Sequence, residues 1–138
     1  MNGRDTSKTL VRGAAAALGL ALAATAAGSA PAVAASYGGQ CGGGYQVVNK
    51  AAISGGTVFL AYSGSTGKNC AVVVRSSPGG AVDMDAALKR SDSTSWQTDP
   101  GDWTEYAGPV YVEAAGQCVD WGGAIGDEWV VRNGTNCG

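Results

Sequence analysis

The sequence predicts an all-β fold: a small antiparallel β-sandwich or barrel-like domain with two disulfides, after an N-terminal signal peptide. Three observations support this prediction. Short β-branched and aromatic runs alternate with turn signals at spacings of about 8 to 12 residues, as in sandwiches and barrels. No sustained helical periodicity is present after residue 35. All four cysteines lie in that part, and an even cysteine number in a short exported chain indicates a disulfide framework.

Residues 1–35 have the three-part pattern of a secretory signal peptide. The first twelve residues carry three basic side chains against one acid, and an apolar run follows from Gly13 to Ala27. The small residues Ala32-Val33-Ala34-Ala35 then provide a cleavage site. A transmembrane anchor is the alternative, but a span needs about 20 strongly apolar residues, whereas this run is mostly Ala and Gly. We therefore expect export, cleavage near Ala34 or Ala35, and a single mature domain over residues 36–138.

The mature part carries six basic and ten acidic residues, a net charge of −4. An acidic surface without a basic stripe argues against nucleic acid as a partner, and against an anionic membrane once the leader is removed. A domain of roughly 100 residues buries only about two-thirds of its unfolded surface, so cross-links are a useful source of stability. The expected location is extracellular, or on the surface of the cell.

The cysteines occur in a repeated sequence context. Gly39-Gln40-Cys41 is followed by Gly67-Lys68-Asn69-Cys70, and Gly116-Gln117-Cys118 is followed by Gly134-Thr135-Asn136-Cys137. Four cysteines permit three connectivities, and sequence alone cannot formally choose among them. The repeat favours Cys41–Cys70 and Cys118–Cys137, each bond closing its own β unit. Because no pair has zinc-ligand spacing and the chain has no histidine, we expect no zinc site.

The first half of the mature part predicts three strands after an irregular segment. Residues 36–44 are mostly glycine, so we expect no element there and a segment held in place by Cys41. The runs 57–62 and 69–75 predict a hairpin, and we expect both strands to be central with two covered faces, because neither alternates cleanly. The other expected elements are a strand over 45–49 and a turn over 52–56.

The second half predicts further strands with more ambiguous boundaries. Residues 82–89 alternate apolar and polar, which predicts a strand with one wet face, although a short helix is an alternative because the residues are good helix formers. Asp99-Pro100-Gly101-Asp102 is a turn motif. The remaining expectations are a polar loop at 91–95, strands at 109–114, 117–121 and 128–132, a turn at 122–126, and a tight turn at Asn133-Gly134.

Few residues offer catalytic chemistry. Without histidine, no Ser-His-Asp or Cys-His arrangement can form. Ser65-Thr66-Gly67-Lys68 matches a serine–lysine pattern, but the glycine-rich setting predicts a hairpin turn and the companion motifs are missing. Asp99, Asp102 and Glu105 could supply paired carboxylates for glycoside cleavage; the alternative is that both aspartates cap the turn and Glu105 is solvated. We expect a protein that is not an enzyme, with no catalytic, cofactor-binding or metal-binding residues.

Aromatic side chains are concentrated in the second half and are the best candidates for contact with a ligand. Aromatic rings stack on sugars, and they also fill cores and interfaces. We expect most of them to be buried, Trp121 and Tyr111 above all. The candidate contact residues are Trp103, Tyr106 and Trp121. The full set consists of Trp96, Trp103, Tyr106, Tyr111, Trp121 and Trp129.

Several stretches together resemble one known family, the spore-associated protein A family of Streptomyces and related actinomycetes. The resemblance covers the mature chain from about Tyr37 to the end, and it implies a small secreted protein found with spores or aerial hyphae, with no known catalytic residue to transfer. The stretches that carry it are Gly56-Thr57-Val58-Phe59-Leu60-Ala61-Tyr62, Thr66-Gly67-Lys68-Asn69-Cys70, Tyr106-Ala107-Gly108-Pro109-Val110-Tyr111, Gly116-Gln117-Cys118-Val119-Asp120-Trp121-Gly122-Gly123 and Gly134-Thr135-Asn136-Cys137-Gly138.

Three functions remain in competition at this point. The first is a non-enzymatic exported protein that adheres to components of the spore or cell-wall surface. The second is a secreted inhibitor or toxin-like β domain, for which a protruding, cystine-tied loop such as 91–103 would be the supporting feature. The third is a glycan-binding module of the cell wall, using the three candidate aromatics.

Overall fold

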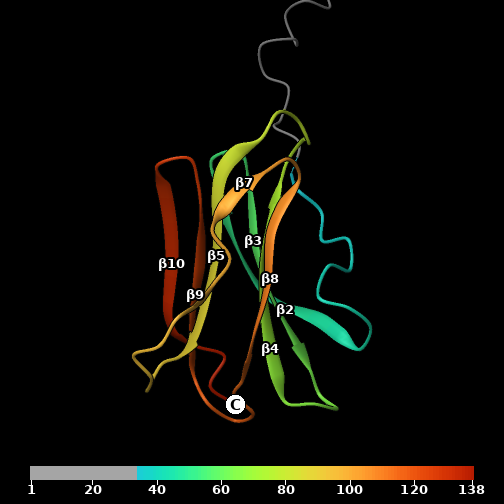
Figure 1. Cartoon of the computed structure of the whole chain (residues 1–138). Coiled ribbons are helices and arrows are strands. Elements are labelled where there is room, and N and C mark those ends of the chain that lie inside the picture. Colours follow the sequence, from blue (N-terminus) through green and yellow to red (C-terminus); the bar gives the residue numbers. More distant parts are fainter. Residues whose placement is uncertain (1–33) are drawn as a thin grey trace, which may run out of the picture. The chain divides into compact units, whose positions relative to one another are not determined.

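The computed structural model describes residues 34–138, which form one compact unit; the predicted signal peptide lies outside the described residues except for Ala34 and Ala35. Every helix or strand element in this part of the chain is a strand, and the strands form two antiparallel sheets that pack face to face (Figure 1). The all-β prediction with two disulfides is therefore confirmed. No helix among these residues is long and apolar enough to cross a membrane.

The two sheets have the following composition. Sheet I has the order β2-β3-β4-β8, and sheet II has the order β10-β9-β5-β6, with β7 also paired to β5. The strands of sheet I are β2 (Tyr45–Ile53), β3 (Gly56–Ser63), β4 (Lys68–Arg75) and β8 (Tyr106–Glu113). Those of sheet II are β5 (Val82–Arg90), β6 (Gln97–Thr98), β7 (Gly101–Trp103), β9 (Val119–Ile125) and β10 (Glu128–Thr135).

The main core lies between the sheets and is built from alternate residues of each strand. Met84, Ala86 and Leu88 of β5 point inward, while Asp83 and Asp85 lie on the other face. Residues 82–89 therefore form a strand with one wet face, as predicted, and the helical alternative is wrong. Trp121 of β9 has no exposed surface, and its indole N–H donates to the Thr135 hydroxyl at 2.8 Å. A buried indole N–H without an acceptor would destabilise the fold, and the Thr135 hydroxyl provides that acceptor.

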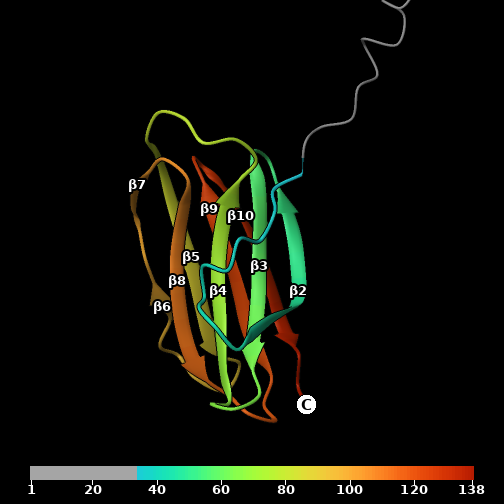
Figure 2. The same ribbon diagram turned by 90° about the vertical axis from the view of Figure 1, so that its right-hand side faces the viewer.

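A second, smaller core covers the outer face of sheet I. Residues 34–44 cross β4 and β3 on that face without forming an element (Figure 2). Tyr37 packs against Phe59 with ring centroids 5.8 Å apart, and its hydroxyl accepts the Cys41 N–H at 3.2 Å. Cys41, Phe59, Cys70, Val72 and Val74 are buried there. The predicted hairpin of residues 57–62 and 69–75 corresponds to β3 and β4, and the prediction that both strands are central and covered on both faces is confirmed.

Both predicted disulfides are present, and each lies on its own sheet. Cys41–Cys70 links the crossing segment to β4, with a sequence separation of 29 residues. Cys118–Cys137 links the residue before β9 to the tail after β10, with a separation of 19 residues. In the chain-entropy model, loops of these lengths stabilise the fold by about 3 to 4 kcal/mol each.

Two of the predicted turns lie inside the strands β9 and β10, and both errors concern glycine. The turn expected at 122–126 lies mostly inside β9, and Asn133-Gly134 lies inside β10; the turn that joins these strands is Gly126-Asp127. Gly122 and Gly123 are strand glycines because other atoms occupy the space of a side chain. A Cβ on Gly123 would overlap Val73 Cγ2 of sheet I and lie 2.7 Å from the Asp85 carbonyl oxygen.

We expect Gly123→Ala to destabilise the protein by about 1 to 3 kcal/mol, the usual cost of overpacking a closed core. The added methyl group has to push Val73 away or separate β9 from β5. Denaturant unfolding with intact disulfides measures this change. Gly134→Ala is not a suitable control because its φ is 64°; Gly43→Ala is one, since nothing lies within 4 Å of its added Cβ and its φ is not positive. Equal stability of the two variants would contradict the close approach at Gly123.

Candidate functional site

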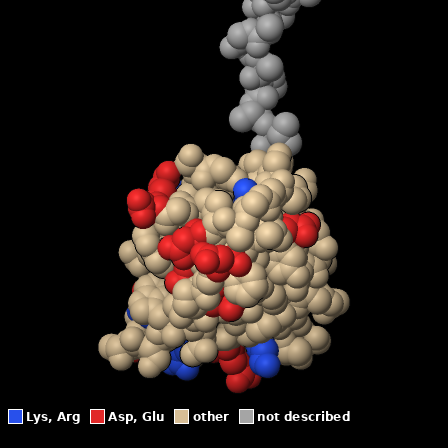
Figure 3. Space-filling view, turned by 45° about the horizontal axis from the view of Figure 1, so that its top comes forward, with Lys and Arg blue, Asp and Glu red and all other residues tan. Residues whose placement is uncertain are grey.

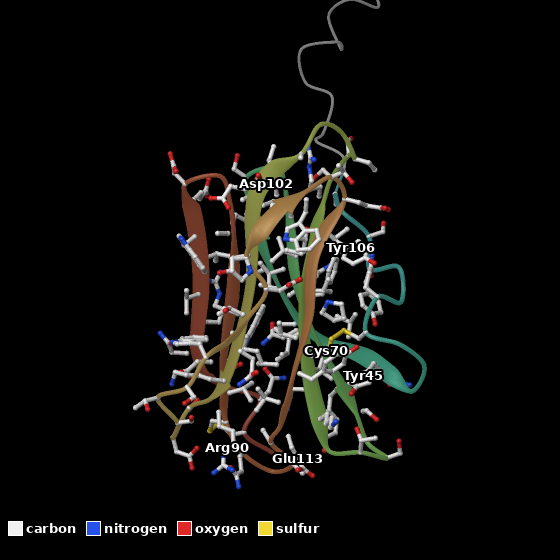
Figure 4. The ribbon with its side chains drawn as sticks, viewed as in Figure 1. Tyr45, Cys70, Arg90, Asp102, Tyr106 and Glu113 are labelled. Atoms are coloured by element: carbon white, nitrogen blue, oxygen red, sulfur yellow. A yellow bond between two sulfur atoms is a disulfide. The ribbon has the colours of Figure 1, made fainter. Side chains whose placement is uncertain are left out.

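Two of the three candidate contact residues lie in one hollow of the surface. Trp103 and Tyr106 line an open depression of about 260 Å³ together with Thr104, Glu105 and Gly108. The depression lies where the end of β7 passes into the start of β8, near the labelled Asp102 and Tyr106 in Figure 4. We call these five residues the β7–β8 depression.

Local packing orients Trp103 at the edge of this depression. Its strand, β7, pairs with β5 so that Trp103 lies opposite Val82 and Gly101 lies opposite Met84. The indole ring covers Gly101, where a Cβ would lie 3.0 Å from the ring, and the indole N–H donates to the Asp99 carbonyl at 3.2 Å. One side of the ring therefore packs against the core, and only its remaining surface is available to a ligand.

Arg75 holds the backbone of three residues that line the depression. Its guanidinium donates to the carbonyl oxygens of Thr104 at 2.9 Å and of Trp103 at 3.4 Å. Its own N–H donates to the Glu105 carbonyl at 3.0 Å. Tyr106 follows as the first residue of β8, with 36% of its surface exposed. Hydrogen bonds from the half-buried Arg75 at the end of β4 therefore hold the backbone that carries Trp103 and Tyr106.

Acidic side chains lie near the depression, and two of them, Asp85 and Asp99, make hydrogen bonds within the fold. Asp83 and Asp102 are directly opposed on β5 and β7, and acidic residues gather on this side of the surface (Figure 3). The Asp85 carboxylate accepts the Asp99 N–H at 2.9 Å, and the Asp99 carboxylate accepts the Gly108 N–H at 2.8 Å. Burial raises the pKa of Asp85 above its ordinary value, against the effect of the Asp99 N–H.

These contacts bear on the chemistry predicted for the acids. The sequence suggested that Asp99 caps a turn at Pro100-Gly101, but its carboxylate instead accepts the N–H of Gly108 on the neighbouring sheet. Residues 101–103 form a strand, β7. Glu105 is exposed. Among residues 34–138, no three Asp, Glu or Cys side chains are grouped closely enough to hold a metal ion. The arrangement offers stacking surfaces and hydrogen-bond acceptors, which are features of binding.

The burial of Trp121 and of Tyr111 corrects two other predictions about aromatic residues: a contact role for Trp121 and a core position for Tyr111. Trp121 has no exposed surface, so the contact role predicted for it does not fit, whereas the core role is confirmed. The prediction that Tyr111 lies in the core is wrong, because 39% of it is exposed on the outer face of sheet I. There it packs against Tyr45 with ring centroids 5.7 Å apart, and its hydroxyl donates to the Cys41 carbonyl at 2.8 Å. Burial also raises the pKa of the Tyr111 hydroxyl.

Residues 91–103 do not form a protruding loop tied by a cystine. Both β6 and β7 pair with β5, and neither disulfide includes a residue of this segment. The Ser91 N–H also donates to the Cys118 carbonyl at 2.9 Å. The structural feature that would support an inhibitor is therefore missing from this segment.

A polar cluster around Asp120 escaped the sequence analysis. Asp120 is 8% exposed, and its carboxylate pairs with the Lys89 ammonium at 2.9 Å and accepts the Ser91 hydroxyl at 2.6 Å and the Gly134 N–H at 2.8 Å. Lys89 also donates to the Ser93 carbonyl at 2.8 Å. The cluster joins the end of β5 to β9 and β10. Only the pairing of these strands brings the groups together, so no local sequence signal marks them.

The Asp120 cluster predicts a loss of stability in acid. Burial by itself raises the carboxyl pKa, but the hydrogen bonds from Ser91, Lys89 and Gly134 together lower it below its ordinary value. Because the pKa of Asp120 is lower in the folded state, its carboxylate stabilises the fold fully at pH values above the pKa of the unfolded state, about 3.9. This stabilisation is lost as the pH falls through the pKa of the folded state. We expect Asp120→Asn to cost about 2 kcal/mol near pH 7, and this difference to shrink below about pH 4.

Denaturant unfolding at several pH values measures this difference, and Asp92→Asn is the matched control. Asp92 forms an exposed ion pair at 2.7 Å with Arg90, the last residue of β5, which also carries Lys89 of the Asp120 cluster. Exposed ion pairs contribute little, so the control should have almost no effect at any pH. Asp85 acts in the opposite direction because its pKa is raised, but it is present in all three proteins. A constant difference between Asp120→Asn and the wild type down to about pH 2 would contradict the depressed pKa.

Comparison with known proteins supplies the family. The chain is 51% identical over 122 residues to spore-associated protein A of Streptomyces coelicolor, covering 87% of this chain and 79% of the relative. The chain belongs to the spore-associated protein A family. The resemblance that the sequence motifs indicated is thereby confirmed. No family model matches the chain, and no solved structure matches it.

Proposed function

We propose that this member of the spore-associated protein A family is an exported, non-enzymatic protein that adheres to the spore or cell surface of an actinomycete. The observation that carries the proposal is the 51% identity with spore-associated protein A over most of both chains. The two disulfides agree with a destination outside the cell, where thiols oxidise and such bonds persist. The carboxylates of Asp85 and Asp99 bond to backbone N–H groups within the fold, which supports a binding role over a catalytic one.

Cross-linking on intact spores tests this proposal. The protein should be recovered with washed spores, with an amino terminus near residue 35, and joined to a component of the outer surface. A strain that lacks the gene and is supplied with the purified protein provides the control for specific attachment. Recovery of the uncleaved chain inside the cell would contradict export. Robust turnover of peptidoglycan or of a protein substrate by the purified protein would contradict the non-enzymatic role.

The β7–β8 depression favours a second candidate, a glycan-binding module. Trp103 and Tyr106 offer ring surface on one hollow, beside the hydroxyl of Thr104 and the carboxylate of Glu105. Rings with nearby acceptors are suited to stack on sugars and bind their hydroxyl groups. If this is the site, Tyr106→Ala should abolish retention on cell-wall polysaccharide. Trp96→Ala is the control, because Trp96 is similarly exposed but lies outside the depression. Unchanged retention of the Tyr106 variant would end the glycan proposal without affecting surface attachment itself.

A further inference from the structure

β10 is an edge strand of sheet II (Figure 1), and it carries two large exposed apolar side chains. Trp129 is 54% exposed and Val131 is 40% exposed, both on the same face of the strand. An edge strand presents unpaired backbone N–H and C=O groups, and a flat apolar edge is a template for another strand. Proteins that remain monomeric usually protect such an edge by charge, proline or a bulge.

The other edges of the sandwich are protected in these ways. β2 carries a bulge around Val48 and the exposed Lys50, and β8 contains Pro109, which has no N–H to donate. β6 and β7 are only two and three residues long. In β10, the run from Glu128 to Arg132 pairs with β9 in unbroken register, and its irregularity comes only after Arg132. Within the described chain, this run is an edge whose register with β9 is unbroken and whose charged side chains, Glu128 and Arg132, lie only at its two ends.

The hairpin geometry determines which backbone groups of β10 face outward. Ile125 and Glu128 flank the two-residue turn, so each donates its N–H to the carbonyl oxygen of the other. We call two opposite residues that exchange both bonds in this way a closed pair. By alternation, Val130 and Arg132 also bond toward β9, whereas the N–H and C=O groups of Trp129 and Val131 face the free edge. In agreement, the Arg132 guanidinium reaches the Val131 carbonyl from outside the ladder, at 3.3 Å.

We propose that β10 pairs antiparallel with β10 of a second copy of this chain, about a two-fold axis at Val130. In this register, Trp129 of one copy is opposite Val131 of the other, so the outward-facing backbone groups meet as two closed pairs. Glu128 of each copy is then opposite Arg132 of its partner. The segment Glu128-Trp129-Val130-Val131-Arg132 is thus complementary to itself in charge, in backbone bonding and in the apolar Trp–Val pairs.

The neighbouring edge strand of sheet I, β2, also has exposed apolar side chains, which supports this side of the sandwich as the contact surface between two copies. β10 and β2 are in contact. Among residues 34–138, four of the seven exposed large hydrophobic side chains are on these two strands: Val47, Val48, Trp129 and Val131. Pairing of one short strand covers less than the roughly 1,600 Å² of a standard interface, so the dimer is a weak, concentration-dependent one. This inference does not depend on the proposed function.

Charge reversal tests the pairing and its register together. Glu128 and Arg132 are exposed and form no ion pair among the described residues, so their replacement should leave the fold intact. Glu128→Arg places two arginines opposite each other at both ends of the pairing, and Arg132→Glu places two glutamates there. Each variant alone should dimerise at least about tenfold more weakly than the wild type. Mixed in equal amounts, the two variants should form a heterodimer, because both charge pairs are then opposite in sign.

Sedimentation equilibrium of the purified protein, from about 1 µM to about 1 mM, measures the association. Lys68→Glu, at the start of β4, is the control for net charge and should dimerise like the wild type. Circular dichroism confirms that each variant is folded. A wild type that is monomeric throughout this range overturns the proposal. So does a dimer that withstands both reversals, or the failure of the two variants to associate with each other.

Discussion

Replacing Trp121 by alanine should lower the free energy of unfolding by about 3 to 5 kcal/mol, the usual cost of truncating a buried tryptophan. Trp121 has no exposed surface and is the largest fully buried side chain in the described part of the chain. The replacement opens a cavity between the sheets and leaves the Thr135 hydroxyl without its donor. Because a small domain is stable by only about 5 to 15 kcal/mol, this one change removes a large share of the total.

Denaturant unfolding with both disulfides intact measures the effect, and Trp121→Phe separates its two causes. Phenylalanine keeps most of the packing but cannot donate to Thr135, so it should cost clearly less, about 1 to 2 kcal/mol. The same pair of variants tests the contact role once considered for Trp121. If alanine left stability unchanged but abolished retention on a glycan, the burial of this side chain in the structure would be contradicted.

Removal of the Cys41–Cys70 bond, as Cys41→Ala together with Cys70→Ala, should cost about 3.5 kcal/mol. The chain-entropy model assigns roughly this value to a loop of 29 residues. The bond also holds residues 34–44 against the outer face of sheet I, so its loss should expose Phe59 and its neighbours. Hydrogen exchange in β3 and β4 should rise together with the loss of stability.

Removal of the Cys118–Cys137 bond provides the matched comparison. Its loop of 19 residues predicts a slightly smaller cost, about 3 kcal/mol. The bond ties down the tail after β10 and covers no second core, so exchange in β3 should stay as in the wild type. If the two double variants lost equal protection in β3, the crossing segment would not be the cover of sheet I.

Much of the fold could be predicted from local sequence signals. Period-two alternation in residues 82–89 identified a strand with one wet face, and the unbroken apolar runs of β3 and β4 identified strands covered on both faces. The repeated context of the four cysteines favoured the pairing that the structure has. Such signals are local because side-chain direction and turn chemistry depend on neighbours within a few residues.

The candidate site was less predictable, since its members meet only through strand pairing. Trp103 and Tyr106 are close in sequence and line the same depression, but nothing local indicates that Arg75 holds the backbone of this segment. The Asp120 cluster joins residues from the ends of three strands. A tryptophan or tyrosine in a strand looks the same whether its face is covered or not, which is why Tyr111 was expected in the core.

Sequence by itself determined that this chain is an all-β, doubly cross-linked protein of the spore-associated protein A family, because alternation, cysteine context and motifs are properties of the chain alone. Only the tertiary structure decided what its glycines and aromatics do. Gly122 and Gly123 look like turn residues in sequence, yet they lie in β9 because a neighbouring strand and the opposite sheet fill the space of a side chain. That space is set by residues distant in the sequence, and close packing between layers leaves no local trace of it.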